Sequence, residues 1–168
     1  IWKGLVGSEM CIRDSIKSIS PLNEEEFLER IKINFNIKLL EEHQPPGSKT
    51  ELSIYLKNKW YLIKIKPQKI SNDFKSQLNS QIVSDFILKD ILNIKTTRKN
   101  RNIEYIKGNQ PIEFLVNKVD NNKMSLAIQL YPHKINEITT MADLGDAMPA
   151  KSTWIEPKLR SGLTIYEY

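Results

Sequence analysis

Two neighbouring segments of the chain alternate between apolar and polar residues, and this alternation limits the folds available to it. Residues 51–57 place three apolar side chains on one side of an extended chain: Leu52, Ile54 and Leu56. Residues 60–66 repeat the period of two, and residues 57–59 between them form a tight turn. The pattern predicts a β-hairpin with one face in water, in which Tyr55 and Trp60 are cross-strand partners.

Helical spacing of apolar residues marks the segments around this hairpin. It predicts helices over residues 21–33, 73–92 and 135–144, and a further helix that begins with Asn109 as its cap and a proline in its first turn. Asn23 and Glu26 have the spacing of a capping box, and Gly145 is placed to end the last of these helices.

Three further segments read as strands. Residues 103–106 and 163–168 are short, whereas residues 123–131 are almost continuously apolar, as expected for a central strand buried on both faces. Strands and helices both alternate and cluster along the chain. We therefore expect an α+β domain, built on a mixed sheet with flanking helices and including the hairpin near its N-terminus.

A polar segment close to the C-terminus concentrates positive charge and hydrogen-bond donors. Its expected anion-binding residues are Lys151, Ser152, Thr153, Lys158, Arg160, Ser161 and Gly162. Lysine supplies a compact ammonium group and arginine a planar fork that suits phosphate or carboxylate oxygens, while glycine lets the backbone approach a ligand. The alternative is a rigid connection whose hydroxyls bond their own backbone. Trp154 reads as a core anchor, and the glycine spacing of a Walker loop is absent.

This segment carries a resemblance to a known family. Residues 148–163 read MPAKSTWIEPKLRSGL, which is similar to the closing phrase MPPKSTWFEPKLRSGL of the family called domain of unknown function 1015. Other stretches fit the same family in the same order: residues 24–28, 55–61 and 91–94, Arg98, Tyr131 with Pro132, and residues 142–149. The resemblance implies the C-terminal half of a longer bacterial or archaeal protein, whose upstream half carries a histidine-rich phrase. It implies no particular reaction.

Two positions depart from the family pattern. Asn79 stands where the family has an aspartate, so a carboxylate base is not available there. His133 stands where the family often has threonine, and we interpret it as a residue at a helix N-terminus. His43, beside two prolines, reads as an isolated loop histidine.

The first fifteen residues resemble a translated sequencing adapter. Residues 9–15 match one reading frame of the library-preparation sequence AGATGTGTATAAGAGACAG, so we expect residues 1–15 to be adapter-derived and the native domain to span residues 16–168 of a metagenomic fragment. The only cysteine, Cys11, lies in this stretch. A native part without cysteine excludes disulfides, thiolate zinc sites and a cysteine nucleophile, and it fits a cytoplasmic protein.

Charge and composition limit the classes of binding partner that we expect. The net charge of +5 is scattered, apart from a basic run over residues 95–101, so we do not expect nucleic-acid binding. No apolar run reaches the roughly 20 residues of a membrane span, and no His, Asp or Glu cluster has metal-ligand spacing. We expect part of a cytoplasmic small-molecule enzyme that binds an anionic small molecule, with its reaction and cofactor unassigned. The alternative is a non-catalytic ligand-binding or regulatory domain that docks on a missing N-terminal half of the same protein.

Overall fold

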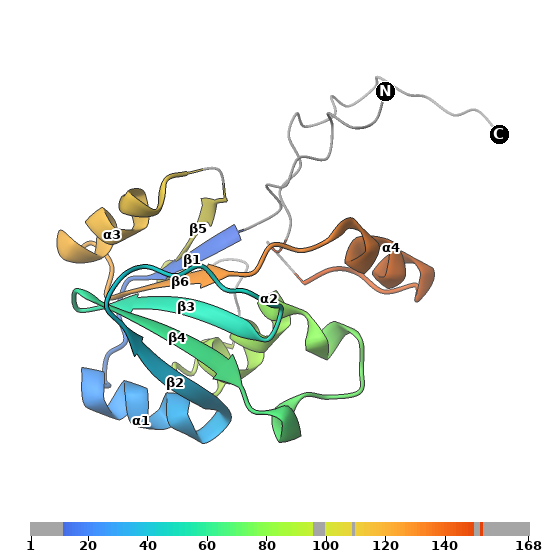
Figure 1. The fold of residues 1–168 in the computed structure, drawn as a ribbon, viewed down its shortest axis with the longest axis horizontal. Coiled ribbons are helices and arrows are strands. Elements are labelled where there is room, and N and C mark those ends of the chain that lie inside the picture. The colour runs from blue at the N-terminus through green and yellow to red at the C-terminus, as the bar shows by residue number, and fades with distance from the viewer. Residues whose placement is uncertain (1–11, 96–99, 109, 150–151, 153–168) are drawn as a thin grey trace.

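One antiparallel sheet organises the protein, and helices cover both of its faces (Figure 1). The computed structural model describes residues 12–95, 100–108, 110–149 and 152. Its strands are β1 (Ile12–Ile16), β2 (Phe35–Leu40), β3 (Glu51–Leu56), β4 (Lys59–Ile65), β5 (Ile103–Lys107) and β6 (Leu126–Leu130). Its α-helices are α1 (Glu24–Asn34), α2 (Asn79–Ile82), α3 (Ile112–Asp120) and α4 (Ile135–Asp143). The strand order is β2-β4-β3-β6-β1-β5, and each pairing between described strands is antiparallel. The α+β class with flanking helices is confirmed.

The hairpin forms at the predicted residues. The turn residues Lys57 and Asn58 have positive φ angles of 43° and 62°, the conformation that two-residue hairpin turns require. Tyr55 lies opposite Trp60, with ring centroids 4.8 Å apart. The expectation of one wet face is wrong for β3, because this strand lies between β4 and β6, and helices cover both sides of it. Ser53 and Tyr55, predicted to be on the wet side, are 0% and 6% exposed.

The alternation of the strands separates two apolar clusters, one on each face of the sheet. The larger one joins β3, β4 and β6 to α1 and to residues 82–94, with Phe27, Ile31 and Ile87 among its fully buried members. The smaller cluster packs Leu115 and Val119 of α3 against the opposite face of the sheet. The period of two along each strand places successive side chains in different clusters.

The capping box predicted at the start of α1 and the glycine predicted to end α4 are both confirmed. The Asn23 side chain accepts a hydrogen bond from the Glu26 N–H at 2.9 Å, and the Glu26 carboxylate accepts one from the Asn23 N–H at 3.0 Å. Gly145, with φ of 68°, follows the C-cap residue Leu144 and ends α4 in the left-handed conformation that glycine adopts without a Cβ clash.

The long helix expected over residues 73–92 is wrong as a single regular element. The chain forms a 3₁₀ turn at Lys75–Gln77, breaks at Leu78 with extended angles, and then runs through α2 into a π-helix at Val83–Lys89. The apolar stripe is nevertheless buried, because the core selects the face while the local hydrogen-bond pattern adjusts to it.

The third predicted helix begins later than expected. Pro111 is the N-cap of α3 rather than a residue of its first turn, and the proposed cap Asn109 lies outside the described residues. The final strand predicted at residues 163–168 and the proposed anchor Trp154 also lie outside them.

The predicted start of the native domain, Ile16, is the last residue of β1. Residues 12–15 extend this strand between β5 and β6. Strand pairing uses backbone groups that every residue except proline carries. Adapter-derived residues can therefore pair in the sheet as native residues do. Within the part of the chain that the structure describes, every helix is too short or too polar to reach across a bilayer.

Candidate functional site

Three segments that are distant in the sequence meet at the buried amide of Asn79, which is 1% exposed. Its Nδ2 donates to the carbonyl oxygens of Lys49 and Glu51 at 2.8 and 3.0 Å, and its Oδ1 accepts from the Tyr131 N–H at 3.1 Å. One side chain thus fixes the start of α2 against the loop before β3 and the segment after β6. An aspartate at this position has no N–H to offer the two carbonyls, so the amide of Asn79 fits this structure where a carboxylate would not.

A hydroxyl, an imidazole and a carboxylate form a continuous array beside this junction. Ser80 Oγ lies 3.1 Å from His133 Nε2, and His133 Nδ1 lies 3.0 Å from Glu137 Oε2. The side chains of His133 and Glu137 are only 4% and 13% exposed. Hydroxyl, base and orienting carboxylate are in the order required for proton transfer from a serine.

The chain supplies this array through the start of α4. His133 and Glu137 are four residues apart and face the same side of the helix start. The Lys134 N–H, which has no backbone partner within the helix because it lies at the N-terminus, donates to Glu137 Oε2 at 3.1 Å. The prediction that His133 lies at a helix N-terminus is correct, but the sequence analysis assigned it no part in a site and did not identify Ser80 and Glu137 as its partners.

The environment of Glu137 favours its ionised form. Burial by itself raises the pKa of Glu137, but the hydrogen bonds from His133 and from the Lys134 backbone oppose it. The electrostatic effects of His133 and Lys49 act in the same direction as these hydrogen bonds, and the pKa ends below its usual value.

A pocket of about 430 Å³ opens on this carboxylate. It is lined by Gly47, Ser48, Lys49, Phe74, Tyr131, Lys134, Asn136, Glu137 and Thr140. Lys49 Nζ has a long hydrogen bond of 3.4 Å to Gln77 Oε1, and Lys134 is exposed. Two lysines, three hydroxyl-bearing residues and one carboxylate therefore line one concave surface, which suits a charged small ligand.

Of the seven predicted anion-binding residues, the structure describes Ser152 alone. Its side chain is buried, 3% exposed, and its Oγ donates to the Pro149 carbonyl at 2.6 Å. Such a bond to the nearby backbone is what a rigid connection predicts, rather than an anion-binding hydroxyl. The other six, Lys151, Thr153, Lys158, Arg160, Ser161 and Gly162, lie outside the described residues. The four-residue spacing of His133 and Glu137, which the sequence analysis did not use, is the signal that could have indicated the site.

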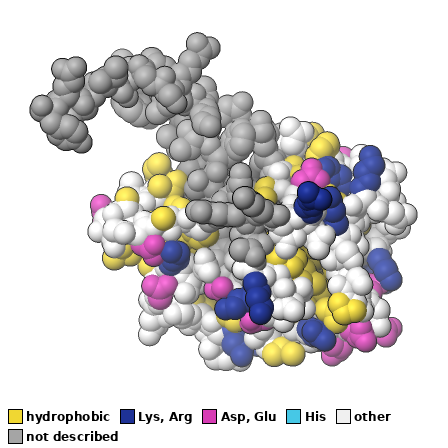
Figure 2. All heavy atoms as spheres, turned by 180° about the vertical axis from the view of Figure 1, so that it is seen from behind, with side chains coloured by type: hydrophobic (Ala, Val, Ile, Leu, Met, Phe, Trp, Pro, Cys, Tyr) yellow, Lys and Arg dark blue, Asp and Glu magenta, His cyan; other side chains and the backbone are white. Residues whose placement is uncertain are grey.

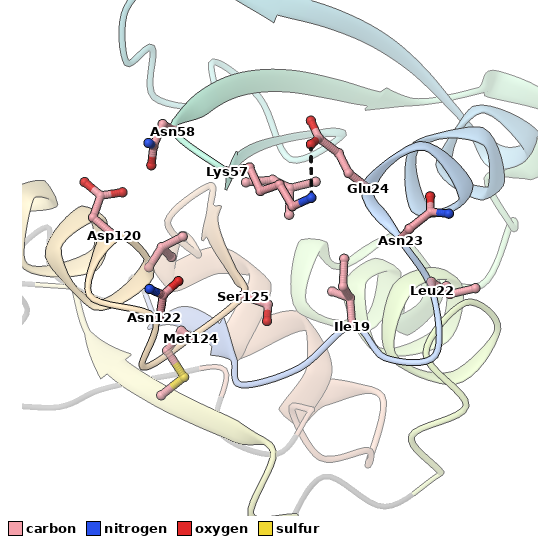
Figure 3. Close-up of a pocket in the computed structure, with 12 residues that line it drawn as sticks. Ile19, Leu22, Asn23, Glu24, Lys57, Asn58, Asp120, Asn122, Met124 and Ser125 are labelled. Atoms are coloured by element: carbon pink, nitrogen blue, oxygen red, sulfur yellow. Dashed lines mark ion pairs between the residues drawn. The ribbon is translucent and has the colours of Figure 1, made fainter.

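A second pocket, of about 570 Å³, lies between the N-terminus of α1, the β3–β4 turn and the loop after α3 (Figure 3). Its carboxylates already have partners: Glu24 lies 3.7 Å from both Lys57 and Lys59, and Asp120 accepts a hydrogen bond from Tyr55 at 2.8 Å. Burial first, and then this bond and the charge of Asp120, raise the pKa of Tyr55 to about 12. We interpret these contacts as structural ties between elements.

His43 is not the isolated loop residue expected from the sequence. Its Nε2 lies 2.6 Å from Gln129 Oε1, and its ring packs on Trp60 with centroids 4.5 Å apart. Among the described residues, no group of three or more His, Cys, Asp or Glu is placed to hold a metal ion.

The face of the molecule that Figure 2 shows carries charges of both signs. On the face shown in Figure 2, basic and acidic side chains are interspersed, and neither sign gathers into one large patch.

Comparison of the chain with models of protein families, with curated proteins and with solved structures found no match. The site is therefore interpreted from its own chemistry.

Proposed function

We propose that this chain is part of a cytoplasmic small-molecule enzyme, and that it holds an anionic group of its ligand with Lys49 and Lys134. The observation that carries the proposal is that both lysines line one pocket. Lysine is a common ligand of phosphate and carboxylate groups because its compact charge approaches several oxygens. Ser48, whose hydroxyl lies 3.0 Å from Thr50 Oγ1, lines the same pocket and adds a short polar side chain.

The array of Ser80, His133 and Glu137 supports an enzyme rather than a passive binding domain. A serine hydroxyl becomes a useful nucleophile when an adjacent imidazole accepts its proton and a carboxylate orients that imidazole. Both distances in the array are within hydrogen-bond range. We extend the proposal to membership of the domain of unknown function 1015 family. The proposed further residues that hold the anion are Lys151, Thr153, Lys158, Arg160, Ser161 and Gly162.

Ligand-induced stabilisation tests the anion site. At a phosphate concentration about 100-fold above Kd, the free energy of unfolding rises by about 2.7 kcal/mol, or about 5–10 °C in Tm. We expect inorganic phosphate to raise Tm in the unmodified chain and in Lys123→Ala, a control at an exposed lysine remote from the pocket. The shift should be lost in Lys49→Ala with Lys134→Ala. Equal shifts in the double variant and the control would contradict the site.

A fluorophosphonate probe tests the catalytic part separately. The Ser80 oxygen would bond to phosphorus as fluoride leaves, with the hydroxyl proton passing to His133. Mass spectrometry should find the label on Ser80, and His133→Gln should abolish it. Ser84→Ala, one turn further along the same helical segment, is the matched control and should be labelled normally.

Absence of labelling in the unmodified chain would favour the alternative, a non-catalytic binding or regulatory domain. That alternative places the missing N-terminal half of the protein on exposed apolar side chains. The large ones among the described residues are Ile33, Leu39, Phe114, Ile135 and Leu144.

A further inference from the structure

Glu137 is the one carboxylate among the residues that line the pocket of Lys49 and Lys134. Its two oxygens have different surroundings. Oε2 receives the hydrogen bonds from His133 and from the Lys134 N–H, whereas no described residue donates to Oε1. The anchored oxygen fixes the orientation of the carboxylate, so the second oxygen remains available to a ligand.

We infer that the ligand of this pocket carries an ammonium group beside its anionic group, and that Glu137 Oε1 binds this ammonium. The inference rests on the proposed function and adds the substrate class: an amine-bearing phosphate or carboxylate. A purely anionic ligand would meet repulsion from Glu137, since two like charges held a few ångströms apart destabilise each other. A ligand with both signs pairs each of its charges with an opposite one.

The charges of the pocket agree with this class. Lys49 and Lys134 contribute two positive charges and Glu137 one negative charge. A phosphate monoester with one ammonium carries two negative charges and one positive charge, which is the complement of this set. An amino acid carboxylate would leave one lysine unpaired, so the two sources of the anionic group are distinguishable by affinity.

His133 acts here as a positioning residue. It holds the Glu137 carboxylate from the buried side, at 3.0 Å, while its other nitrogen is fixed by Ser80 at 3.1 Å. A carboxylate held by two donors cannot turn freely toward the lysines of the pocket. The charge of Lys49 still favours the ionised form of Glu137, but among the described residues no salt bridge joins this carboxylate directly to Lys49 or Lys134.

The test compares ligands that differ only in the ammonium group. Isothermal titration of the full chain would measure O-phosphoethanolamine against ethyl phosphate, and β-alanine against propionate. We expect the phosphate with an ammonium group to bind about tenfold or more tightly than ethyl phosphate, the range of one hydrogen bond between charged partners. In Glu137→Gln the preference should fall to within about twofold, while ethyl phosphate still binds. Glu113→Gln, an exposed carboxylate in the first turn of α3, is the matched control and should keep the preference.

The outcomes separate the inference from the proposal on which it rests. Equal affinity of the unmodified chain for both phosphates overturns the ammonium site and leaves the anion site intact. A preference that persists in Glu137→Gln overturns the role of this residue. No binding of any of the four ligands overturns both. The comparison within the unmodified chain needs no variant, so it holds even where a substitution prevents folding.

Discussion

Replacement of Asn79 is the most informative test of how this fold holds its site together. The side chain makes three hydrogen bonds to backbone groups of Lys49, Glu51 and Tyr131, and it is 1% exposed. Asn79→Ala removes all three bonds and leaves two carbonyls and one N–H without this partner. Each bond contributes about 1 kcal/mol net, and groups left unsatisfied in the interior add to the loss.

The three bonds together give an expected loss of about 3 kcal/mol in the free energy of unfolding. For a chain of this size that loss lowers Tm by about 6–12 °C. Urea denaturation followed by circular dichroism measures it directly, provided that the slope against denaturant is unchanged. Asn36→Ala, at an exposed asparagine of β2, is the control and should change stability by no more than about 0.5 kcal/mol.

The isosteric change Asn79→Asp separates hydrogen bonding from shape. It keeps the volume but directs carboxylate oxygens at the carbonyls of Lys49 and Glu51, which offer no proton. We expect a loss at neutral pH at least as large as that of Asn79→Ala. A loss below about 1 kcal/mol in both variants would refute the assignment of Asn79 as the junction of the site.

The surroundings of Glu137, Tyr55 and Gly145 each lead to a prediction. First, the pKa of Glu137 is lowered in the folded chain, so its contribution to stability is present above the unfolded value of 4.5 and is lost as pH falls through the folded value; Tm against pH for the unmodified chain and Glu137→Gln should differ near neutral pH and converge in acid. Second, one tyrosine should ionise at a pKa of about 12, detectable by ultraviolet difference absorbance and absent in Tyr55→Phe; because this pKa is raised, the associated stability is present below the usual value of 10 and falls as pH rises between 10 and 12. Third, Gly145→Ala should cost about 1 kcal/mol by thermal denaturation, because φ of 68° strains any residue with a Cβ although nothing lies within 4 Å of the added atom; an unchanged Tm would contradict the importance of this helix end.

Much of the fold was accessible from local patterns. The hairpin, the capping box of Asn23 and Glu26, and the end of α4 at Gly145 depend on residues within a few positions of each other, where backbone sterics and short-range hydrogen bonds decide the conformation. The break at Leu78 was not predictable in this way. The 3₁₀ turn before the break buries none of its residues, whereas Leu78 and apolar residues after it are buried in the core, and this difference depends on tertiary contacts.

For the candidate site too, some residues were selected from the local sequence and others are brought together only by the tertiary structure. The residues of the polar segment around Lys151 and Arg160 were selected from their density in the sequence, and that selection remains a prediction. Ser80 and His133 are 53 residues apart, and the loop of Lys49 is 30 residues from Asn79, so no local pattern connects them. The antiparallel pairing of β3 with β6 brings these segments to the same end of the sheet.

The sequence by itself therefore determined the hairpin, strands β5 and β6, helices α1 and α4 with the capping box and the terminal glycine, and the burial of most apolar faces, because periodicity and short-range hydrogen bonding act over a few residues. It did not indicate β1 or β2. Only the tertiary structure decided which polar side chains meet. The contact of Ser80 with His133, like the placement of Lys49 and Lys134 around Glu137, depends on strand order and register, which are properties of the whole sheet.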